Sequence, residues 1–397
     1  GQSYTLTADV SDAAGNAAAQ VTSSSFAVDT TLPSIGAIAT GAFSWGTHLN
    51  ATEDNNNGTV TVTTTGVEDG QTVTITLNGS TYTNTVSSNA TTVTITAAAL
   101  QALTDGQSYT LTADVSDAAG NAAAQVTSSA FTYDKTAPTV SSFTMSDTAL
   151  DADDTATVTI VFSHAVSGFA SDDDVTVVNG ALPSMTSSDD ITWTGTYTPT
   201  ADVEDSTNVL TLGTNWTDTA GNAYAGVATP TANFTIDTST PSIGAIGTGA
   251  FSWGTHLNAT EDNNNGTVTV TTTGVEDGQT VTITLNGSTY TNTVSSNATT
   301  VTITAAALQA LTDGQSYTLT ADVSDAAGNA AAQVTSSAFT YDKTAPSISA
   351  IATSALSWGA VLNATEDNSN GTVTVTTVGV EDGQTVTITL NGSTYTN

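Results

Sequence analysis

The chain has 397 residues, of which 38% are hydrophobic and 10% are charged, and none is cysteine. Its 37 acidic residues stand against two lysines, and the formal net charge of −35 argues strongly against nucleic acid or anionic membrane surfaces as partners. Without cysteine there is no disulfide, thiolate metal site or redox motif, so packing, backbone hydrogen bonds and bound ions have to supply stability.

Long internal repeats begin at the first residue. The block GQSYTLTADVSDAAGN starts at Gly1, Gly106 and Gly314, and residues 40–138 read the same as residues 248–346. A chain that copies about a hundred residues in this way is built as an array of modules. An array needs length, spacing and repeated joints, whereas an enzyme needs one site that differs from its surroundings.

Four linkers of the form Asp-x-x-x-Pro divide the chain, and each follows a short alternating strand. Proline cannot donate to a strand ladder and restricts the backbone, so these linkers are expected domain boundaries. They predict a partial domain at 1–30 with only the last two strands, a type A repeat at 31–135, a divergent type B repeat at 136–238, a second type A repeat at 239–343, and a partial type A repeat with the first strands at 344–397.

Alternating residues predict seven strands in the first complete module, since period-2 patterns such as Val73, Ile75 and Leu77 indicate one buried face. Asn78-Gly79 is a hairpin turn signal, and residues 97–103 predict one short helix. Seven strands in about a hundred residues are typical of an immunoglobulin-like sandwich, and the fold class is therefore all-β, a linear array of such domains. The expected strands lie near residues 34–38, 59–65, 72–77, 81–86, 91–96, 108–115 and 125–133.

Acidic residues recur at the same places in every module. In an antiparallel sandwich the loops alternate between the two ends, so stacked modules would bring the lower acidic set of one against the upper set of the next. At the Pro138 joint this predicts Glu53, Asp54, Asp105 and Asp134 opposite Asp218; at the Pro241 joint it predicts Asp151, Asp153, Asp154, Asp202, Glu204, Asp205 and Asp237 opposite Glu276, Asp277 and Asp325.

Carboxylates that converge without a lysine or arginine between them are costly unless a cation sits there. Calcium fits best, because it accepts six to eight oxygen ligands in loose geometry, whereas Mg²⁺ prefers more water. The other interpretation is that these are ordinary turn residues in solvent. The candidate metal ligands are Asp12, Asp29, Glu53, Asp54, Glu68, Asp69, Asp105, Asp117, Asp134, Asp218, Asp237, Glu261, Asp262, Glu276, Asp277, Asp313, Asp325, Asp342, Glu381 and Asp382.

A family resemblance rests on the run Asp-Ala-Ala-Gly-Asn, then a strand, then Asp-Lys-Thr-Ala-Pro. The run resembles the tandem bacterial immunoglobulin-like repeats of giant secreted adhesins and biofilm proteins, and the type B module looks like a second variety of the same repeats. The resemblance implies repeats that extend a distal binding tip from the cell surface, stiffened by Ca²⁺ between domains. The positions that it carries over are Asp12, Asp29, Asp117, Asp134, Asp218, Asp237, Asp325 and Asp342.

Catalysis finds little support in the sequence. His48 and His256 are repeat equivalents, and Val361 takes their place in the third copy, so we interpret the histidines as surface loop residues. Trp45 and its equivalents Trp253 and Trp358 favour a core or joint role over a carbohydrate platform. We therefore expect a non-enzymatic extracellular rod with calcium at its joints, whose partners are further repeats of the same chain. The alternative is a subunit of a laterally assembled filament, sheath or surface layer. The chain is also expected to continue beyond both of its ends.

Overall fold

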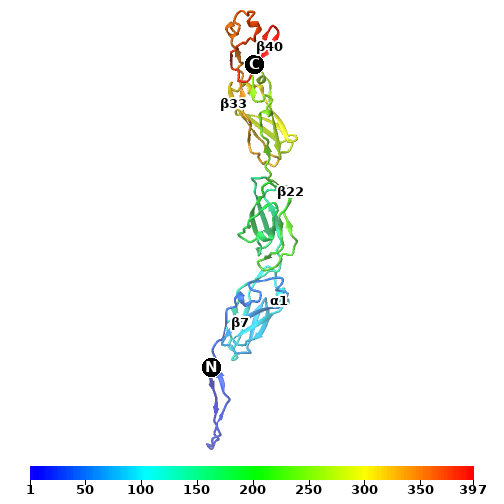
Figure 1. Ribbon diagram of the computed structural model, residues 1–397. Coiled ribbons are helices and arrows are strands. Elements are labelled where there is room, and N and C mark those ends of the chain that lie inside the picture. The colour runs from blue at the N-terminus through cyan, green and yellow to red at the C-terminus, as the bar shows by residue number, and fades with distance from the viewer. The chain divides into compact units, whose positions relative to one another are not determined.

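The computed structural model describes residues 1–397 (Figure 1). Two compact units make up the chain, and each is described here by itself. The first contains residues 1–148, 155–200 and 206–235, and the second contains residues 149–154, 201–205 and 236–397. Nearly all regular structure is β-strand, which confirms the all-β fold class. No helix is long and apolar enough to cross a membrane.

The first complete domain, β5 to β14, contains three small sheets with the strand orders β10-β7-β5, β11-β14-β6 and β13-β12-β8-β9. Figure 1 labels β7 and the short helix α1 in this domain. Its elements are β5 (Ser34–Ile35), a 3₁₀ turn (Thr40–Ala42), β6 (His48–Leu49), β7 (Gly58–Thr65), β8 (Thr72–Leu77), β9 (Ser80–Thr85), β10 (Ala90–Ile95), α1 (Ala97–Gln101), β11 (Gln107–Tyr109), β12 (Thr112–Asp114), β13 (Val126–Thr127) and β14 (Phe131–Tyr133).

The β8–β9 hairpin follows directly from the sequence pattern. Val73, Ile75 and Leu77 are buried, and the threonines between them face outward or are only half-buried. Asn78 and Gly79 both have positive φ, at 49° and 80°, as the predicted two-residue turn requires. Leu77 consequently pairs with Ser80, and the register continues to Thr72 and Thr85.

The two long strands expected near 108–115 and 125–133 are each broken into two. β11 pairs with β14 in one sheet, and β12 pairs with β13 and β8 in another, so the chain changes sheet near Leu111. At the break the Ser128 hydroxyl accepts a hydrogen bond from Leu111 N at 2.9 Å and replaces a ladder partner. The strand β6, parallel to β14, was also not predicted. The domain therefore has more and shorter strands than the seven expected.

An aromatic cluster anchors the core of the first domain. Trp45 stacks on Phe43, with ring centroids 5.3 Å apart, and meets Phe131 edge-on at 5.2 Å. Trp45 is only 6% exposed, which agrees with its expected packing role. Gly58 lies against its ring, because a Cβ at residue 58 would come within 2.4 Å of the indole.

We predict that Gly58→Ala lowers the unfolding free energy of this domain by about 1–3 kcal/mol, because the added methyl overpacks the core against Trp45. Calorimetry of the full chain would show one domain transition at lower temperature. Gly41→Ala is the matched control, since a Cβ at residue 41 meets nothing within 4 Å. Equal shifts for both variants would contradict the packing argument.

The middle domain, β15 to β26, is the divergent module. Its core is centred on Trp216, whose ring centroid lies 4.5 Å from those of Phe162 and Tyr224. Within the first unit its strand orders are β15-β17-β21-β20, β18-β24 and β19-β23-β25. The elements are β15 (Val140–Met145), β16 (Ala149–Leu150), β17 (Ala156–Phe162), β18 (Val166–Ser167), α2 (Ser171–Asp174), β19 (Val175–Thr176), β20 (Gly180–Ala181), β21 (Thr192–Pro199), β22 (Glu204–Asn208), β23 (Thr211–Leu212), β24 (Thr217–Asp218), β25 (Thr229–Pro230) and β26 (Phe234–Asp237).

The third domain, β27 to β36, repeats the first, including the stacking of Trp253 on Phe251 at 5.3 Å. Its sheets have the orders β27-β29-β32, β28-β36-β33 and β31-β30-β34-β35. The elements are β27 (Ser242–Ile243), 3₁₀ turns at Thr248–Ala250 and Glu261–Asn263, β28 (His256–Leu257), β29 (Gly266–Thr273), β30 (Thr280–Leu285), β31 (Ser288–Thr293), β32 (Ala298–Ile303), α3 (Ala305–Gln309), β33 (Gln315–Tyr317), β34 (Leu319–Asp322), β35 (Val334–Thr335) and β36 (Phe339–Tyr341).

The two end segments contain parts of the same repeat, and their large apolar side chains are exposed. Residues 1–30 form two paired ribbons, β1 with β4 and β2 with β3. The ribbon strands are β1 (Gln2–Tyr4), β2 (Thr7–Ala8), β3 (Val21–Thr22) and β4 (Phe26–Val28). Residues 344–397 contain β37 (Ser347–Ile348), 3₁₀ turns at Thr353–Ala355 and Glu366–Asn368, β38 (Thr377–Val378), β39 (Thr387–Leu390) and β40 (Ser393–Thr396).

Candidate joints between the domains

Each Asp-x-x-Gly-Asn turn is organised by its own aspartate. In the middle domain Asp218 Oδ1 accepts from Asn222 N at 2.8 Å, and Asp218 Oδ2 accepts from Asn222 Nδ2 at 2.9 Å. The same pair of bonds joins Asp12 to Asn16, Asp117 to Asn121 and Asp325 to Asn329. The asparagine side chain in turn holds the pKa of Asp12 and Asp117 below its ordinary value.

Most other candidate ligands also accept local backbone hydrogen bonds, as residues that stabilise turns do. Each linker aspartate accepts from the N–H two residues later, and Glu53 and Glu261 accept from the N–H three residues earlier, at Asn50 and Asn258. The linker pairs are Asp29 with Thr31, Asp134 with Thr136, Asp237 with Ser239, and Asp342 with Thr344. The remaining acceptors of an N–H are Glu68 from Ala118, Glu276 from Ala326, Asp69 from Ser88, Asp277 from Ser296, Asp105 from Lys135, and Asp313 from Lys343.

Asp54 and Asp262 point into their own domains rather than toward a joint. Asp54 is 5% exposed, and its Oδ2 accepts a 2.6 Å hydrogen bond from the hydroxyl of the fully buried Tyr133. Asp262 and Tyr341 repeat this pair at 2.7 Å. The bond ties the loop that precedes β7 or β29 to the strand that leads into the linker. It therefore fixes the end of the domain on which the next domain sits.

These phenols stay neutral to high pH. Burial raises the pKa of Tyr341 from 10.0 to about 12, and the hydrogen bond to Asp262 adds to the shift. Burial also raises the pKa of Tyr197 to about 12. Their contribution to stability is therefore complete below pH 10 and is lost as the pH rises through about 12.

Alkaline titration followed by tyrosinate absorbance should consequently show a late step near pH 12 that coincides with unfolding. Tyr341→Phe should make that late step smaller. A single step at the ordinary tyrosine pKa of about 10, for every tyrosine in the folded chain, would contradict this assignment.

The first joint lies around Asp134–Pro138, where the turn of the middle domain meets the loop between β6 and β7. Asn222 Oδ1 accepts from Ala51 N at 2.9 Å, and Asn222 Nδ2 donates to the linker carbonyl of Asp134 at 2.9 Å. Asn50 Nδ2 donates to Ala220 O at 3.0 Å. Three hydrogen bonds thus connect the middle domain with the end of the first domain and its linker.

Charge at the first joint is partly balanced. Burial raises the pKa of Asp134, the carboxylates of Asp218 and Asp105 raise it further, and His164 opposes them. Burial alone would also raise the pKa of Asp105, but hydrogen bonds from Thr136 and Lys135 and the charge of Lys135 lower it overall. Of the predicted joint set, Asp105 and Asp218 are therefore each close enough to Asp134 to raise its pKa. A lysine and a histidine accompany them.

The second joint lies around Asp237–Pro241, within the second unit. Asn329 Oδ1 accepts from Ala152 N at 2.8 Å, and Asn329 Nδ2 donates to Asp237 O at 2.8 Å, so two of the three bonds of the first joint recur. Beside them is a cavity of about 200 Å³, lined by Glu204, Asp237, Ser239, Gly274, Val275, Glu276, Asn297 and Asp325. No lysine, arginine or histidine is among these residues. Burial raises the pKa of Asp237, and Asp325 and Glu276 raise it further.

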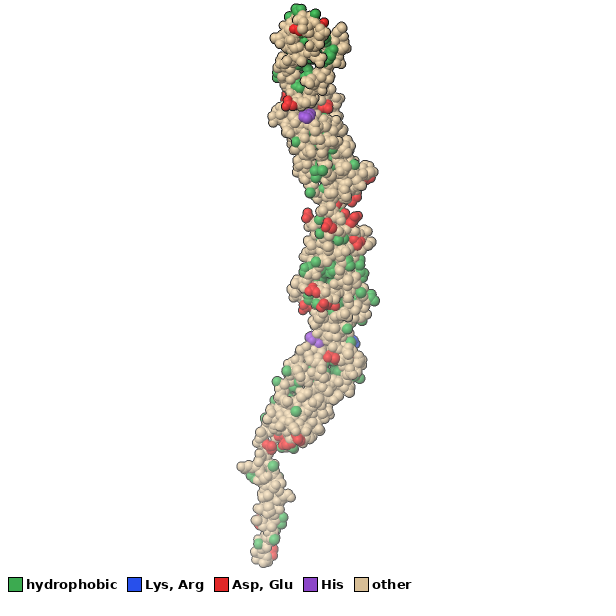
Figure 2. Space-filling model, in the orientation of Figure 1, with side chains coloured by type: hydrophobic (Ala, Val, Ile, Leu, Met, Phe, Trp, Pro, Cys, Tyr) green, Lys and Arg blue, Asp and Glu red, His purple; other side chains and the backbone are tan.

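The structure brings together four members of the set predicted for the second joint: Glu204, Asp237, Glu276 and Asp325. No three histidine, aspartate or glutamate side chains are arranged as a group that could hold a metal ion. Figure 2 shows acidic side chains in separate groups, with backbone, uncharged polar and hydrophobic surface between them. Among the remaining candidates, Glu381 lines a groove in the last segment, and Asp382 is exposed.

The sequence interpretation did not identify the asparagines. Asn222 and Asn329 are 6% and 4% exposed and carry the contacts at both joints, whereas only their aspartate neighbours were proposed as functional. A signal was present, because asparagine closes the turn at residues 16, 121, 222 and 329, even in the divergent module. The histidines were interpreted as surface loop residues, but His48 and His256 lie on β6 and β28; His256 is exposed, and His48 and His164 are half-buried.

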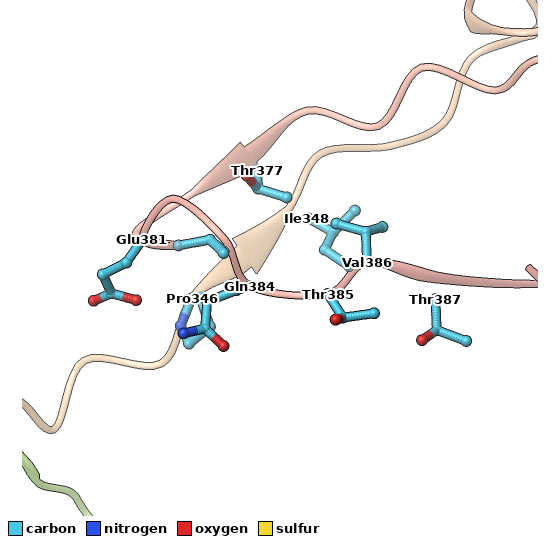
Figure 3. A pocket seen from close by; sticks show the side chains of 9 residues that line it. Pro346, Ile348, Thr377, Glu381, Gln384, Thr385, Val386 and Thr387 are labelled. Atoms are coloured by element: carbon cyan, nitrogen blue, oxygen red, sulfur yellow. The ribbon is translucent and has the colours of Figure 1, made fainter. Parts of the chain in front are cut away.

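A groove of about 370 Å³ in the last segment is an open core, not a binding site (Figure 3). Ile348, which lines it, is 61% exposed. The equivalent residue of the first domain is Ile35, 8% exposed, and Val386 and Val380 correspond to the buried Val73 and Val67. In the complete domains the later strands cover this surface.

Comparison with known proteins gives the class. Residues 134–236 match the family model of the bacterial Ig-like domain. A bacterial immunoglobulin-like domain from the M. primoryensis ice-binding adhesin is 32% identical, and the match covers 96% of that domain and 26% of this chain, with a TM-score of 0.20. Residues 134–236, the middle domain, belong to the bacterial Ig-like domain family.

Two further solved structures are similar to longer parts of the chain. A Ca²⁺-stabilized adhesin, described as helping an Antarctic bacterium to reach out and bind ice, is 27% identical over 93% of this chain and 88% of that one, with a TM-score of 0.39. A tetra-tandem repeat from the extending region of a large adhesion protein is 20% identical over 86% of this chain and 82% of that one, with a TM-score of 0.28. No curated protein matches the chain.

Proposed function

We propose that this chain is a length of the extender region of a bacterial cell-surface adhesin, and that calcium stiffens it at the joints between domains. It is a structural, extracellular, non-enzymatic array whose task is to hold a distal part of the protein away from the cell. The observation that carries the calcium proposal is the cavity at the second joint, which four carboxylates line without a cationic side chain.

The extender role follows from the repetition. The first and third domains have the same sequence over about a hundred residues and the same core, so neither has a site that the other lacks. The joints differ instead. At the first joint a type A repeat precedes the divergent module, and at the second joint the divergent module precedes a type A repeat. A series of small sandwiches, whose longest strands have eight residues and span about 26 Å at ~3.3 Å per residue, gains length with every copy.

The chemistry of the second joint suits calcium. Carboxylate, amide and carbonyl oxygens are the donors that Ca²⁺ takes, and all of the charged groups at the cavity are carboxylates. Asp237 Oδ1 and Glu276 Oε2 accept backbone hydrogen bonds, which leaves the second oxygen of each group for a cation. Asp237, Glu276, Asp325 and Glu204 line the cavity but are not arranged as a metal-holding group, so their side chains would have to turn toward a bound ion. A bound ion would supply the positive charge that removes their repulsion.

Isothermal titration calorimetry of the full chain tests the proposal. We expect Ca²⁺ to bind, and Glu276→Gln to weaken the binding roughly fivefold or more, because one unit charge about 4 Å from an ion contributes ~1 kcal/mol even in bulk water. Glutamine keeps an oxygen for Ala326 N. Glu68→Gln is the comparison variant, since Glu68 makes the same contact with Ala118 in the first domain. An absence of calcium heat, or unchanged binding in Glu276→Gln, would rule out a site at this joint.

A further inference from the structure

We infer that the asparagine of each Asp-x-x-Gly-Asn turn is an interdomain clasp, which docks a domain onto the one before it through hydrogen bonds that need no metal ion. The partner is the end face of the preceding domain. At the first joint Asn222 bonds Ala51 N and Asp134 O, and at the second Asn329 bonds Ala152 N and Asp237 O.

The clasp recognises backbone, not side chains. In both joints the asparagine oxygen accepts from the N–H of an alanine that follows the buried Leu49 or Leu150 by two residues, and its nitrogen donates to the carbonyl of the linker aspartate. The preceding domain is type A at the first joint and the divergent module at the second. Because the acceptor and donor are main-chain atoms, either type of domain can precede or follow the other.

The aspartate of each turn orients the asparagine that forms the clasp. Both oxygens of Asp218 are occupied by Ala220 N, Asn222 N and Asn222 Nδ2, so the carboxylate fixes the orientation of the asparagine amide. Asp325 holds Asn329 through the same acceptors. The carboxylates at this position therefore accept hydrogen bonds from their own turn, and Asp325 does so while it also lines the cavity at the second joint. Each orients the asparagine that forms the clasp.

The chain contains its own comparison for this inference. Asn121 is only half-buried, and residues 1–30, which precede its domain, do not contain an equivalent of the loop that carries Ala51. Asn121 keeps the linker contact alone, with Asp29 O at 3.2 Å. The two-bond contact accordingly occurs where the loop that carries Ala51 or Ala152 faces the turn.

The test uses the full chain, which has no cysteine, with spin labels at Thr83→Cys and Val227→Cys, both exposed positions in the first and middle domains. Pulsed electron resonance in excess chelator should give one narrow distance distribution. Asn222→Ala should shift the docked–undocked equilibrium roughly 5–30-fold toward the undocked form and broaden the distribution, because it loses two hydrogen bonds across the joint. Asn121→Ala, at the turn without a complete partner, should leave it unchanged.

A second variant guards against misfolding of the Asn222→Ala domain. Asn50→Asp removes the donor to Ala220 O but keeps the loop acceptor, and the divergent module already has Asp151 at this position. It should broaden the distribution less than Asn222→Ala does, because both bonds of Asn222 remain, while the circular dichroism and thermal transitions stay unchanged. Narrow distributions for both variants in chelator, or a wild-type distribution as broad as theirs, would overturn the clasp. A narrow distribution that appears only with calcium, and equally in all variants, would support the proposed function and also overturn the clasp.

Discussion

Trp45→Ala is expected to lower the unfolding free energy of the first domain by about 3–5 kcal/mol, the usual loss for a large aromatic side chain removed from a core. Trp45 is 6% exposed and packs between Phe43, Phe131 and Gly58, so a substantial cavity would remain. A single domain is stable by only about 5–15 kcal/mol, and the variant should therefore unfold far below the wild-type temperature. Calorimetry of the full chain would show this as one displaced transition.

The control variant, Trp45→Phe, keeps an aromatic ring at this position but removes the indole nitrogen. Trp45 Nε1 is buried and has no hydrogen-bond partner, so Trp45→Phe removes an unpaired donor together with part of the ring. We expect a clearly smaller loss for phenylalanine than for alanine. Trp253→Ala provides a replicate in the third domain, where the same ring stacks on Phe251. A loss below about 1 kcal/mol for either alanine variant would show that the tryptophan is not the core anchor.

Tyr133→Phe is expected to destabilise the first domain by about 1–3 kcal/mol, because it leaves the buried carboxylate of Asp54 without its donor. The lost hydroxyl also releases the loop that carries Asn50 and Ala51 to the first joint. Chemical denaturation followed by tryptophan fluorescence gives the free energy, and the spin-label distance between the first and middle domains reports the joint.

Asp54→Asn separates the two contributions to the loss of stability, namely the missing hydrogen bond and the cost of a buried charge without a partner. Asparagine can still accept from Tyr133 but has no charge to bury, so in the Tyr133→Phe background it should recover part of the stability. The double-mutant cycle should give a coupling free energy of about 0.5–3 kcal/mol between the two residues. Additive effects would contradict the direct bond, and Tyr341 with Asp262 offers the same cycle in the third domain.

The local sequence pattern was enough to predict strand β8 and the hairpin turn that follows it. The alternation of Val73, Ile75 and Leu77 with threonine gave β8 at the residues predicted, and Asn78-Gly79 gave the turn. The same alternation runs without interruption through residues 108–115, although the chain changes sheet there. The change depends on Ser128, seventeen residues away from Leu111, and on contacts that no local pattern encodes.

The positions of the acidic residues at the domain ends could be predicted from the sequence, but the direction in which each side chain points could not. Asp54 and Glu53 are neighbours in sequence, yet one bonds a buried phenol and the other a backbone N–H of its own loop. Sandwich topology placed Asp237, Glu276 and Asp325 at one joint, and they line one cavity. Asn222 was missed because an asparagine in a turn is usually explained by its backbone conformation, and here its amide also reaches a second domain.

The net negative charge of the chain affects how its domain ends can meet at the joints. With a net charge of −35, two domain ends that both carry carboxylates repel one another unless a cation or a hydrogen-bond network offsets the repulsion. The first joint has Lys135 and His164 near its aspartates, and the second has neither. Calcium should consequently affect the second joint more than the first, while the asparagine clasp acts at both.

Small-angle X-ray scattering of the full chain, with calcium and then with excess chelator, tests the extender most directly. We expect the profile of an elongated rod in calcium, and a shorter maximum dimension with a broader distribution of shapes in chelator, because the joint at Asp237–Pro241 would lose the calcium ion proposed there. The same profile under both conditions, or a compact particle in calcium, would contradict this expectation.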